Sequence, residues 1–236
     1  MKTFLRLIRF TNLLMVALCQ LLVRACLLLP HQPWSRVLLD GPFALLVFST
    51  LCIAAAGYII NDYYDIKIDA INKPKRVVVG KFVNRRKAML AHLLLSGIGV
   101  IIGFYLSLPI GFIHLGSALL LWGYSARLKQ TFLIGNTTIA LLSATMVLVV
   151  AVFEKVDNKA VWAYGAFVFL ITIVREIIKD MEDLKGDATF DCRTLPIVMG
   201  IAGAKWFLYF FILAFAITLL AGLFTGFRKC ILPPTS

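Results

Sequence analysis

Long apolar runs separated by short polar segments dominate this 236-residue chain. A helix needs roughly 20 apolar residues to cross a bilayer core of about 30 Å, and each run comes close to that length. The predicted spans cover residues 11–29, 41–60, 88–107, 110–127, 132–152, 160–178 and 203–224. The first run is not typical of a secretory signal peptide, because Arg24 interrupts it and further spans follow. The pattern predicts an all-α, polytopic transmembrane helix bundle.

One acidic pattern occurs twice, at an offset of 118 residues. Both copies read D-x-x-D-x-x-x-D, at Asp62, Asp65 and Asp69 and again at Asp180, Asp183 and Asp187. The span at 41–60 corresponds to 160–178 under this shift, and 88–107 corresponds to 203–224. We therefore predict one transmembrane domain, residues 1–236, built from two helical repeats at about 1–129 and 130–236. A counterpart of the span at 110–127 would run past Ser236, so the second repeat is predicted to be incomplete, with a truncation at the C-terminus.

Each acidic motif would place its carboxylates on one face of a helix. At about 100° per residue, Asn61 and the three aspartates of the first motif fall within an arc of roughly 100°, and those of the second within roughly 60°. Carboxylates this close repel one another unless a cation lies among them. Oxygen ligands without Cys or His favour a hard ion such as Mg²⁺. We predict that the two motifs face one cavity and form a clamp for Mg²⁺ and a diphosphate, with all six aspartates catalytic and metal-binding.

Composition and charge place this clamp in a membrane protein. The sequence is 61% hydrophobic, with a mean hydropathy of +0.90, which excludes an ordinary soluble domain. Its formal net charge is +12, but the 24 Lys and Arg are unevenly distributed along it. Six fall on the side away from the motifs and 18 on the motif side. The positive-inside rule therefore predicts that the N-terminus and the active site are cytoplasmic, and nucleic acid is not a predicted partner.

Several other side chains near the motifs are candidates for substrate binding. The cations and polar groups expected to contact phosphate or substrate are Asn12, Asn61, Arg76, Tyr124, Lys129, Arg175 and Lys179. Arg9 is expected only to anchor the end of the first span. Glu176 is a candidate fourth ligand or general base, but an ion pair with Lys179 is narrowly favoured. Tyr58, Tyr124, Tyr63, Tyr64 and Phe48 are candidates for an aromatic wall around an allyl cation. The five cysteines and three histidines show no metal-site spacing.

Three segments together resemble the UbiA superfamily of intramembrane prenyltransferases. They are Asn61-Asp62-x-x-Asp65-x-x-x-Asp69, Tyr124-Ser125-x-x-Leu128-Lys129 and Asp180-x-x-Asp183-x-x-x-Asp187. The flanks 68–74 and 175–180 look most like the digeranylgeranylglyceryl phosphate synthase branch of that superfamily. The resemblance implies a UbiA-type fold of nine helices, two more than this sequence contains. It also implies that Asn61 and the six aspartates bind Mg²⁺ and a prenyl diphosphate.

The residues and the resemblance lead to one preferred function and several alternatives. We expect Mg²⁺-dependent transfer of a prenyl group, geranylgeranyl if the branch is right, to a lipophilic acceptor. The expected acceptor is the hydroxyl of a prenylglycerol phosphate, which would form an ether. An aromatic quinone precursor or a tetrapyrrole is the alternative acceptor. A divalent-cation transporter is an alternative of another class, although its acids should lie near mid-span. A truncated, inactive membrane protein is a third interpretation.

Overall fold

The computed structural model describes residues 2–74 and 77–231, and these are helical except for turns and one isolated bridge between Val79 and Val83. The helices are α1 (Lys2–Leu7), α2 (Phe10–Leu22), η1 (Val23–Leu28), α3 (Trp34–Leu38), α4 (Gly41–Tyr64), α5 (Ile66–Asn72), α6 (Arg85–Leu106), α7 (Leu108–Ala126), η2 (Leu128–Gln130), α8 (Ile134–Glu154), α9 (Lys159–Glu182), α10 (Leu184–Thr189) and α11 (Leu195–Ile231). This confirms the predicted all-α class.

Seven helices in the described part of the protein are long and apolar enough to cross a membrane, in agreement with the seven predicted spans. The first is α2 continued by the π-helical η1, from Phe10 to Leu28. The last begins earlier than predicted, at Leu195, because a short helical stretch leads into it across a break at Gly200. Gly200 has φ 69° and ψ 171°, a conformation that glycine adopts without steric cost. A span beyond Ser236 stays a prediction.

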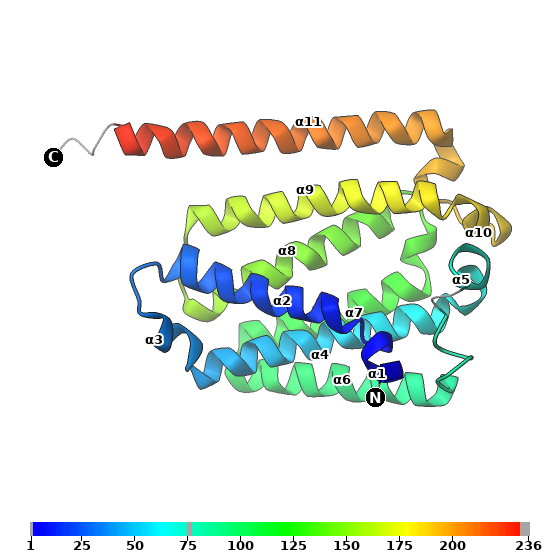
Figure 1. Ribbon diagram of the computed structural model, residues 1–236, viewed down its shortest axis with the longest axis horizontal. Helices are drawn as coiled ribbons and strands as arrows, with labels where there is room; N and C mark the ends of the chain where they lie inside the picture. Colours follow the sequence, from blue (N-terminus) through cyan, green and yellow to red (C-terminus); the bar gives the residue numbers. More distant parts are fainter. Residues whose placement is uncertain (1, 75–76, 232–236) are drawn as a thin grey trace.

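The spanning helices form one bundle with both acidic motifs at the same end (Figure 1). α4 packs against α6 and α7, α8 packs against α9, and α11 lies along α9. α2 crosses this arrangement and contacts α4 and α8. α5 and α10, which follow α4 and α9, lie beside each other at one end, and α3 lies at the other end. The two motifs therefore meet although they are far apart in the sequence.

The 118-residue offset recurs in the bounds of α4 and α9. α4 runs from Gly41 to Tyr64 and α9 from Lys159 to Glu182, so both the first and the last residues correspond. Each helix is preceded by a side-chain cap, since Asp40 accepts from the amide of Phe43 and Asn158 from the amide of Ala160. Such caps satisfy amides that have no partner inside the helix. The shared offset thus describes local structure as well as sequence.

Neither acidic motif lies on one continuous helix, so the predicted single helical face is wrong. α4 is followed directly by Asp65, where φ is −85° and ψ is 2°, and α9 is followed directly by Asp183, where φ is −88° and ψ is 3°. Asp is unfavourable inside a helix because its side chain can form hydrogen bonds with nearby backbone groups in non-helical conformations. The break starts a new short helix at each site, α5 and α10. The third aspartate of each motif, Asp69 or Asp187, is carried on that short helix.

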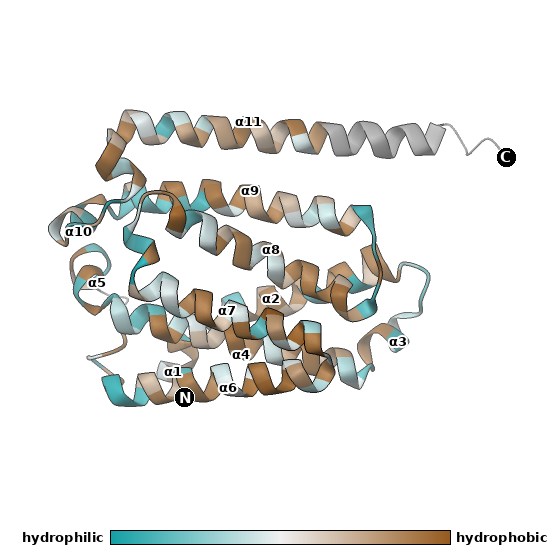
Figure 2. Ribbon diagram, turned by 180° about the vertical axis from the view of Figure 1, so that it is seen from behind, coloured by the Kyte–Doolittle hydropathy of each residue, from teal (hydrophilic) through white to brown (hydrophobic). Residues whose placement is uncertain are grey.

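A cluster of buried apolar side chains lies at the end of the bundle away from the motifs. A buried cluster there includes Val23, Phe43, Leu46, Ile110, Val147, Val150 and Val161. Arg24 is only 4% exposed, pairs with Asp40 and with Glu154 (2.7 Å), and lies over the ring of Phe43. Hydrophilic segments colour both ends of the bundle in Figure 2, and apolar residues dominate the helices between them. The acid-bearing end is the one that contains an open polar cavity.

Candidate functional site

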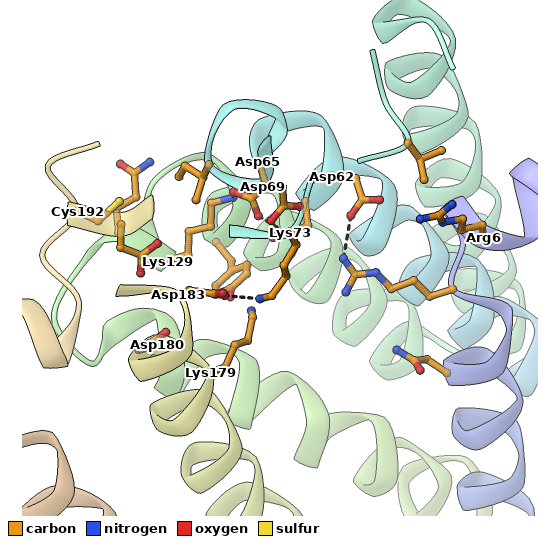
Figure 3. A pocket seen from close by; sticks show the side chains of 18 of the residues that line it. Arg6, Asp62, Asp65, Asp69, Lys73, Lys129, Lys179, Asp180, Asp183 and Cys192 are labelled. Carbon is orange, nitrogen blue, oxygen red and sulfur yellow. Dashed lines mark hydrogen bonds and ion pairs between the residues drawn. The ribbon is translucent and has the colours of Figure 1, made fainter. Parts of the chain in front are cut away.

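A polar cavity of about 670 Å³ lies at the end of the bundle where α4 and α9 terminate. All six motif aspartates line it, together with cations from α1, η2 and α9 and with Lys73, which follows α5. The predicted meeting of the two motifs in one cavity therefore agrees with the structure. Figure 3 shows Asp62, Asp65 and Asp69 of the first motif and Asp180 and Asp183 of the second around the space into which the amino groups of Lys73, Lys129 and Lys179 point.

The first two aspartates of the first motif each have a defined neighbour. Asp62 pairs with Arg9 at 2.8 Å, and Asp65 pairs with Lys129 and accepts from the Asn61 amide at 2.9 Å. Arg9 lies between α1 and α2 with φ 51°, a left-handed conformation that is uncommon for a non-glycine residue. This turn brings the N-terminal segment, and the guanidinium with it, over the cavity.

The second motif is held by a lysine from the first repeat and an amide from α8. Lys73 pairs with Asp183 at 2.5 Å, and the Asn136 amide donates to Asp180 at 2.8 Å. Asn136 is buried at the beginning of α8, where its only described acceptor is this carboxylate. A buried amide hydrogen-bonded to a carboxylate fixes that carboxylate's orientation. Asp180 is thus held in place for a ligand on its other oxygen.

A clasp of hydrogen bonds joins α5 to α10 over the cavity. The Asn72 side chain donates to the carbonyl of Asp183 at 2.9 Å and accepts from the amide of Gly186 at 2.8 Å. A Cβ on residue 186 would lie 2.4 Å from Asn72 Nδ2, so only glycine permits this approach. The Asn72–Gly186 clasp, with the Lys73–Asp183 pair beside it, ties together the two segments that carry Asp69 and Asp187.

Burial and crowding of like charges raise the pKa of the third aspartate in each motif. Burial raises the pKa of Asp69 from 3.8 to about 6, with the carboxylates of Asp65 and Asp62 adding to the effect. Burial likewise raises the pKa of Asp187 to about 6, with Asp183 and Asp65 contributing. Burial also raises the pKa of the nearby Cys192 thiol to about 11, which keeps it protonated and unreactive at neutral pH. Crowded carboxylates of this kind favour a bound cation.

The donor set fits Mg²⁺ bound together with a phosphate ligand. The cavity offers carboxylate oxygens from six aspartates and the amide oxygen of Asn61. Within residues 2–74 and 77–231, no three His, Cys, Asp or Glu side chains converge closely enough to form a complete metal site. Mg²⁺ is commonly held by one or two carboxylates with substrate phosphates supplying further oxygens, rather than by an all-protein cage. The arrangement matches that mode of binding.

A second, more apolar cavity of about 510 Å³ continues from the polar one toward the middle of the bundle. Both cavities share the residues Arg9, Asn12, Asn61, Tyr124 and Lys179. We call this second cavity the apolar chamber; its walls come from α2, α4, α7, α8 and α9. A polar head and an apolar tail of one ligand would thus find adjoining compartments.

Two of the five aromatic candidates line the chamber. Tyr58 and Tyr124 are wall residues, and the guanidinium of Arg9 lies 5.0 Å from the centre of the Tyr58 ring. Tyr63 and Tyr64 instead contact each other edge to face, and Phe48 is 51% exposed on the outer surface. Helical spacing explains the position of Tyr63, which lies about 200° around α4 from Asn61 and so points away from the face that carries Asn61 and Asp65.

The other predicted substrate-binding residues also lie in these cavities. Asn12, Asn61, Tyr124, Lys129 and Lys179 line the polar cavity, and Arg175 lines the apolar chamber. Arg76 lies outside the described residues. Glu176 pairs with Arg175 at 2.7 Å and with Lys179 at 3.4 Å, which confirms the ion-pair role that the sequence narrowly favoured.

Sequence reasoning missed four residues that the fold brings to the site. Arg9 lines both cavities and binds Asp62, which goes beyond the expected anchor role. Lys73 is one of the 18 Lys and Arg on the motif side, and the sequence marks neither Asn72 nor Asn136 as a candidate. Asn136 carries a weak signal, because an amide at the end of an apolar span resembles the case of Asn12. Asn72 and Lys73 carry none beyond their position after the first motif, since their partners are more than 100 residues away.

Comparison with known proteins places this sequence among prenyltransferases. A model of the "UbiA prenyltransferase family" matches residues 13–233. The digeranylgeranylglyceryl phosphate synthase of Methanothermobacter thermautotrophicus is 38% identical over 161 residues, which cover 67% of this chain and 57% of that protein. The enzyme of the same name from Methanosphaera stadtmanae is 34% identical over 203 residues, covering 85% of this chain and 70% of that one. The chain thus spans little more than half the length of the first of these relatives.

Solved structures agree on the fold. A structure of digeranylgeranylglyceryl phosphate synthase superposes with a TM-score of 0.71 at 27% identity, covering 92% of this chain and 75% of that one. A UbiA homologue from Archaeoglobus fulgidus, solved with DMAPP and Mg²⁺, gives a TM-score of 0.74 at 17% identity, covering 92% of this chain and 76% of that one. With the family model matching most of its length, the chain belongs to the UbiA prenyltransferase family.

Proposed function

We propose that this protein transfers a prenyl group from its diphosphate to the hydroxyl of a prenylglycerol phosphate, with Mg²⁺ as cofactor and an ether as product. The observation that carries the proposal is the pair of adjoining cavities, one lined by six aspartates and several cations, the other by apolar side chains. The relatives named digeranylgeranylglyceryl phosphate synthase support both the geranylgeranyl donor and this acceptor. Mg²⁺ and DMAPP in the Archaeoglobus fulgidus homologue support the cofactor.

The residues of the two cavities suit ionisation of an allylic diphosphate. Asn61 and the six aspartates would hold Mg²⁺, which supplies neutralising charge for the diphosphate as the C–O bond breaks. Lys73, Lys129 and Lys179 would contact phosphate oxygens, since their amino groups already point into that space. Tyr58 and Tyr124 line the passage to the chamber, where their rings would face the allyl cation. The apolar walls would keep water from that cation until the acceptor hydroxyl attacks.

Packing at the far end favours an enzyme over a divalent-cation transporter. A transport path would need polar groups through the bundle to the opposite side. The described residues below the chamber include the buried apolar cluster of Phe43, Leu46 and Val147, and the charged group buried beside it, Arg24, is paired with Asp40 and Glu154. The six aspartates all lie at one end of the bundle, and the walls of the adjoining chamber are mostly apolar. An aromatic or tetrapyrrole acceptor stays an alternative that a choice of acceptors in the transfer assay distinguishes.

The decisive experiment measures transfer by the purified protein in lipid nanodiscs with radiolabelled geranylgeranyl diphosphate. Product should form with Mg²⁺ and a prenylglycerol phosphate, and should disappear with a chelator. Asp65→Asn and Asp183→Asn should each lower turnover on the order of 100-fold or more, because each removes a carboxylate that would hold the Mg²⁺ needed to neutralise the leaving diphosphate. Asp157→Asn is the matched control at the opposite end, where Asp157 accepts from the Trp162 ring nitrogen, and should change turnover by no more than about two-fold.

Near-normal turnover in both motif variants would refute the clamp. If product forms with 4-hydroxybenzoate as the acceptor but not with a prenylglycerol phosphate, the acceptor is aromatic and the proposed acceptor is wrong. Mg²⁺ flux into sealed vesicles without any product would favour a transporter.

A further inference from the structure

A layer of buried polar side chains closes the inner end of the apolar chamber. The Gln20 amide donates to Thr50 Oγ1 at 3.2 Å and to the carbonyl of Met146 at 2.9 Å. Thr50 Oγ1 lies 3.5 Å from His114 Nε2, and His114 Nδ1 lies 3.2 Å from the carbonyl of Gly99. We call Gln20, Thr50 and His114 the polar floor. Its members come from α2, α4 and α7 and are buried.

Tightly packed residues surround the polar floor. Thr50 and His114 both line the chamber, while Leu46, one turn below Thr50, is completely buried in the core cluster. A Cβ on residue 103 would lie 2.7 Å from His114 Nδ1, so α6 holds the imidazole closely in position. An apolar tail that pushed through this layer would have to break hydrogen bonds between groups with no water to replace them.

Helix geometry sets the depth of this floor. Thr50 precedes Asp65 by 15 residues on α4, and Val168, another residue of the chamber wall, precedes Asp183 by the same number on α9. At 1.5 Å per residue, both walls are about 22 Å deep from the motif level, and about 17 Å deep from Asn61, where the two cavities join. The tail therefore has roughly 17–22 Å of chamber available.

The lengths of prenyl groups can be compared with this depth. An extended hydrocarbon advances by about 1.2 Å per bond, as the backbone of an extended peptide does. The backbone of three isoprene units then spans roughly 13 Å, four units roughly 18 Å and five units roughly 23 Å. Three units stop roughly 4–9 Å short of the floor, four units end close to its level, and five units extend roughly 1–6 Å past it.

We propose that the polar floor of Gln20, Thr50 and His114 measures the prenyl tail and selects a donor of four isoprene units. This inference rests on the proposed function for the identity of the ligand, but it concerns binding and is tested by binding. The tail would extend from the Asn61 level along Tyr58, Ala54 and Ser117 and end on Thr50 and His114. Selection follows because a fifth unit meets hydrogen-bonded groups and packed core instead of space.

The test uses non-ionisable thiolodiphosphates with three, four and five isoprene units, and measures their dissociation constants in nanodiscs with Mg²⁺. The unmodified protein should bind the four-unit analogue at least about ten-fold more tightly than the five-unit one. Ala54→Phe places a ring one turn above Thr50, about 6 Å nearer the motifs, and should reverse the preference in favour of three units. His114→Ala removes part of the floor. It should lower the ratio of the dissociation constants of the five-unit and four-unit analogues at least about five-fold.

Controls separate the floor from general damage to the fold. Ser117→Phe fills the same level as Ala54→Phe from α7, so agreement between these two variants excludes a local effect on α4. Gly116→Phe adds the same ring beside Ser117 but outside the chamber, where a Cβ meets nothing within 4 Å, and should leave the ranking unchanged. The proposal is refuted if the unmodified protein binds the four-unit and five-unit analogues equally tightly. It is also refuted if Ala54→Phe and Ser117→Phe weaken the binding of all three analogues by the same factor. Failure of transfer with intact ranking would count against the proposed function alone.

Discussion

At the scale of single residues, the site is a set of carboxylates interleaved with the protein's own cations. Arg9, Lys129 and Lys73 each pair with an aspartate from one of the motifs. Partly buried pairs of this kind offset the mutual repulsion of the acids while a diphosphate and metal are being bound or released. Asp69 and Asp187 have no such described partner, and the pKa of each is raised to about 6. The charge of both groups therefore changes between pH 7.5 and pH 5.5.

These raised pKa values predict a pH-dependent requirement for metal. Metal ligation requires ionised Asp69 and Asp187, so lowering the pH from 7.5 to 5.5 should protonate both and raise the Mg²⁺ concentration for half-maximal transfer by about ten-fold or more. Because both pKa values are raised on folding, metal-free protein should become more stable over the same acidification, as the cost of burying two charges disappears. Titrations of Mg²⁺ and thermal unfolding at both pH values check this. An Mg²⁺ requirement independent of pH would contradict the ligand role.

At the scale of elements, a helix break in each acidic motif places the third aspartate of that motif on a separate short helix. α4 and α9 both end at the middle aspartate of their motif, and the backbone then turns into α5 and α10. The Asn72–Gly186 clasp holds these short helices together, which keeps Asp69 and Asp187 over the cavity. A short helix has little stability of its own, so its position depends on such tertiary contacts.

The clasp gives a second prediction. Asn72→Ala should lower the free energy of unfolding by about 1–3 kcal/mol and raise the Mg²⁺ concentration for half-maximal transfer about ten-fold, because both hydrogen bonds are lost. Gly186→Ala should act in the same direction through its clash with Asn72. Asn84→Ala is the control, since Asn84 caps α6 away from the cavity and should cost about 1 kcal/mol of stability without changing the Mg²⁺ requirement. An unchanged requirement in both clasp variants would show that α10 is positioned by other contacts.

At the scale of the whole molecule, the bundle is open at one end and solid at the other. The open end carries the motifs and most of the Lys and Arg, and the solid end carries the core cluster and the buried Arg24 network. We propose that the open end faces the cytoplasm, because basic residues are retained on that side of a membrane.

Orientation is directly measurable. In a variant without native cysteines, a cysteine at Lys185 on α10 should resist a membrane-impermeant maleimide applied to intact cells, and one at Gln32 near α3 should react. Both should react after permeabilisation, which controls for accessibility. External labelling at position 185 but not at 32 would reverse the proposed topology.

The sequence alone determined the membrane class, the seven spans and the chemistry of the site. Hydrophobic length is a local property, and a repeated acidic motif specifies its ligand atoms without reference to the fold. The sequence also determined that the motifs lie at corresponding helix ends, because the same local pattern produces the same break at Asp65 and Asp183.

Tertiary structure alone decided which groups complete the site. The partners of Asp183, Asp180 and Asp62 come from the end of α5, from α8 and from the α1–α2 turn, and pairing across such distances leaves no periodic signal in the sequence. The polar floor is another case, since Gln20, Thr50 and His114 lie on three helices and read individually as isolated polar residues in apolar runs. Their shared depth follows from how the helices pack, because a contact between helices depends on the register and crossing of both.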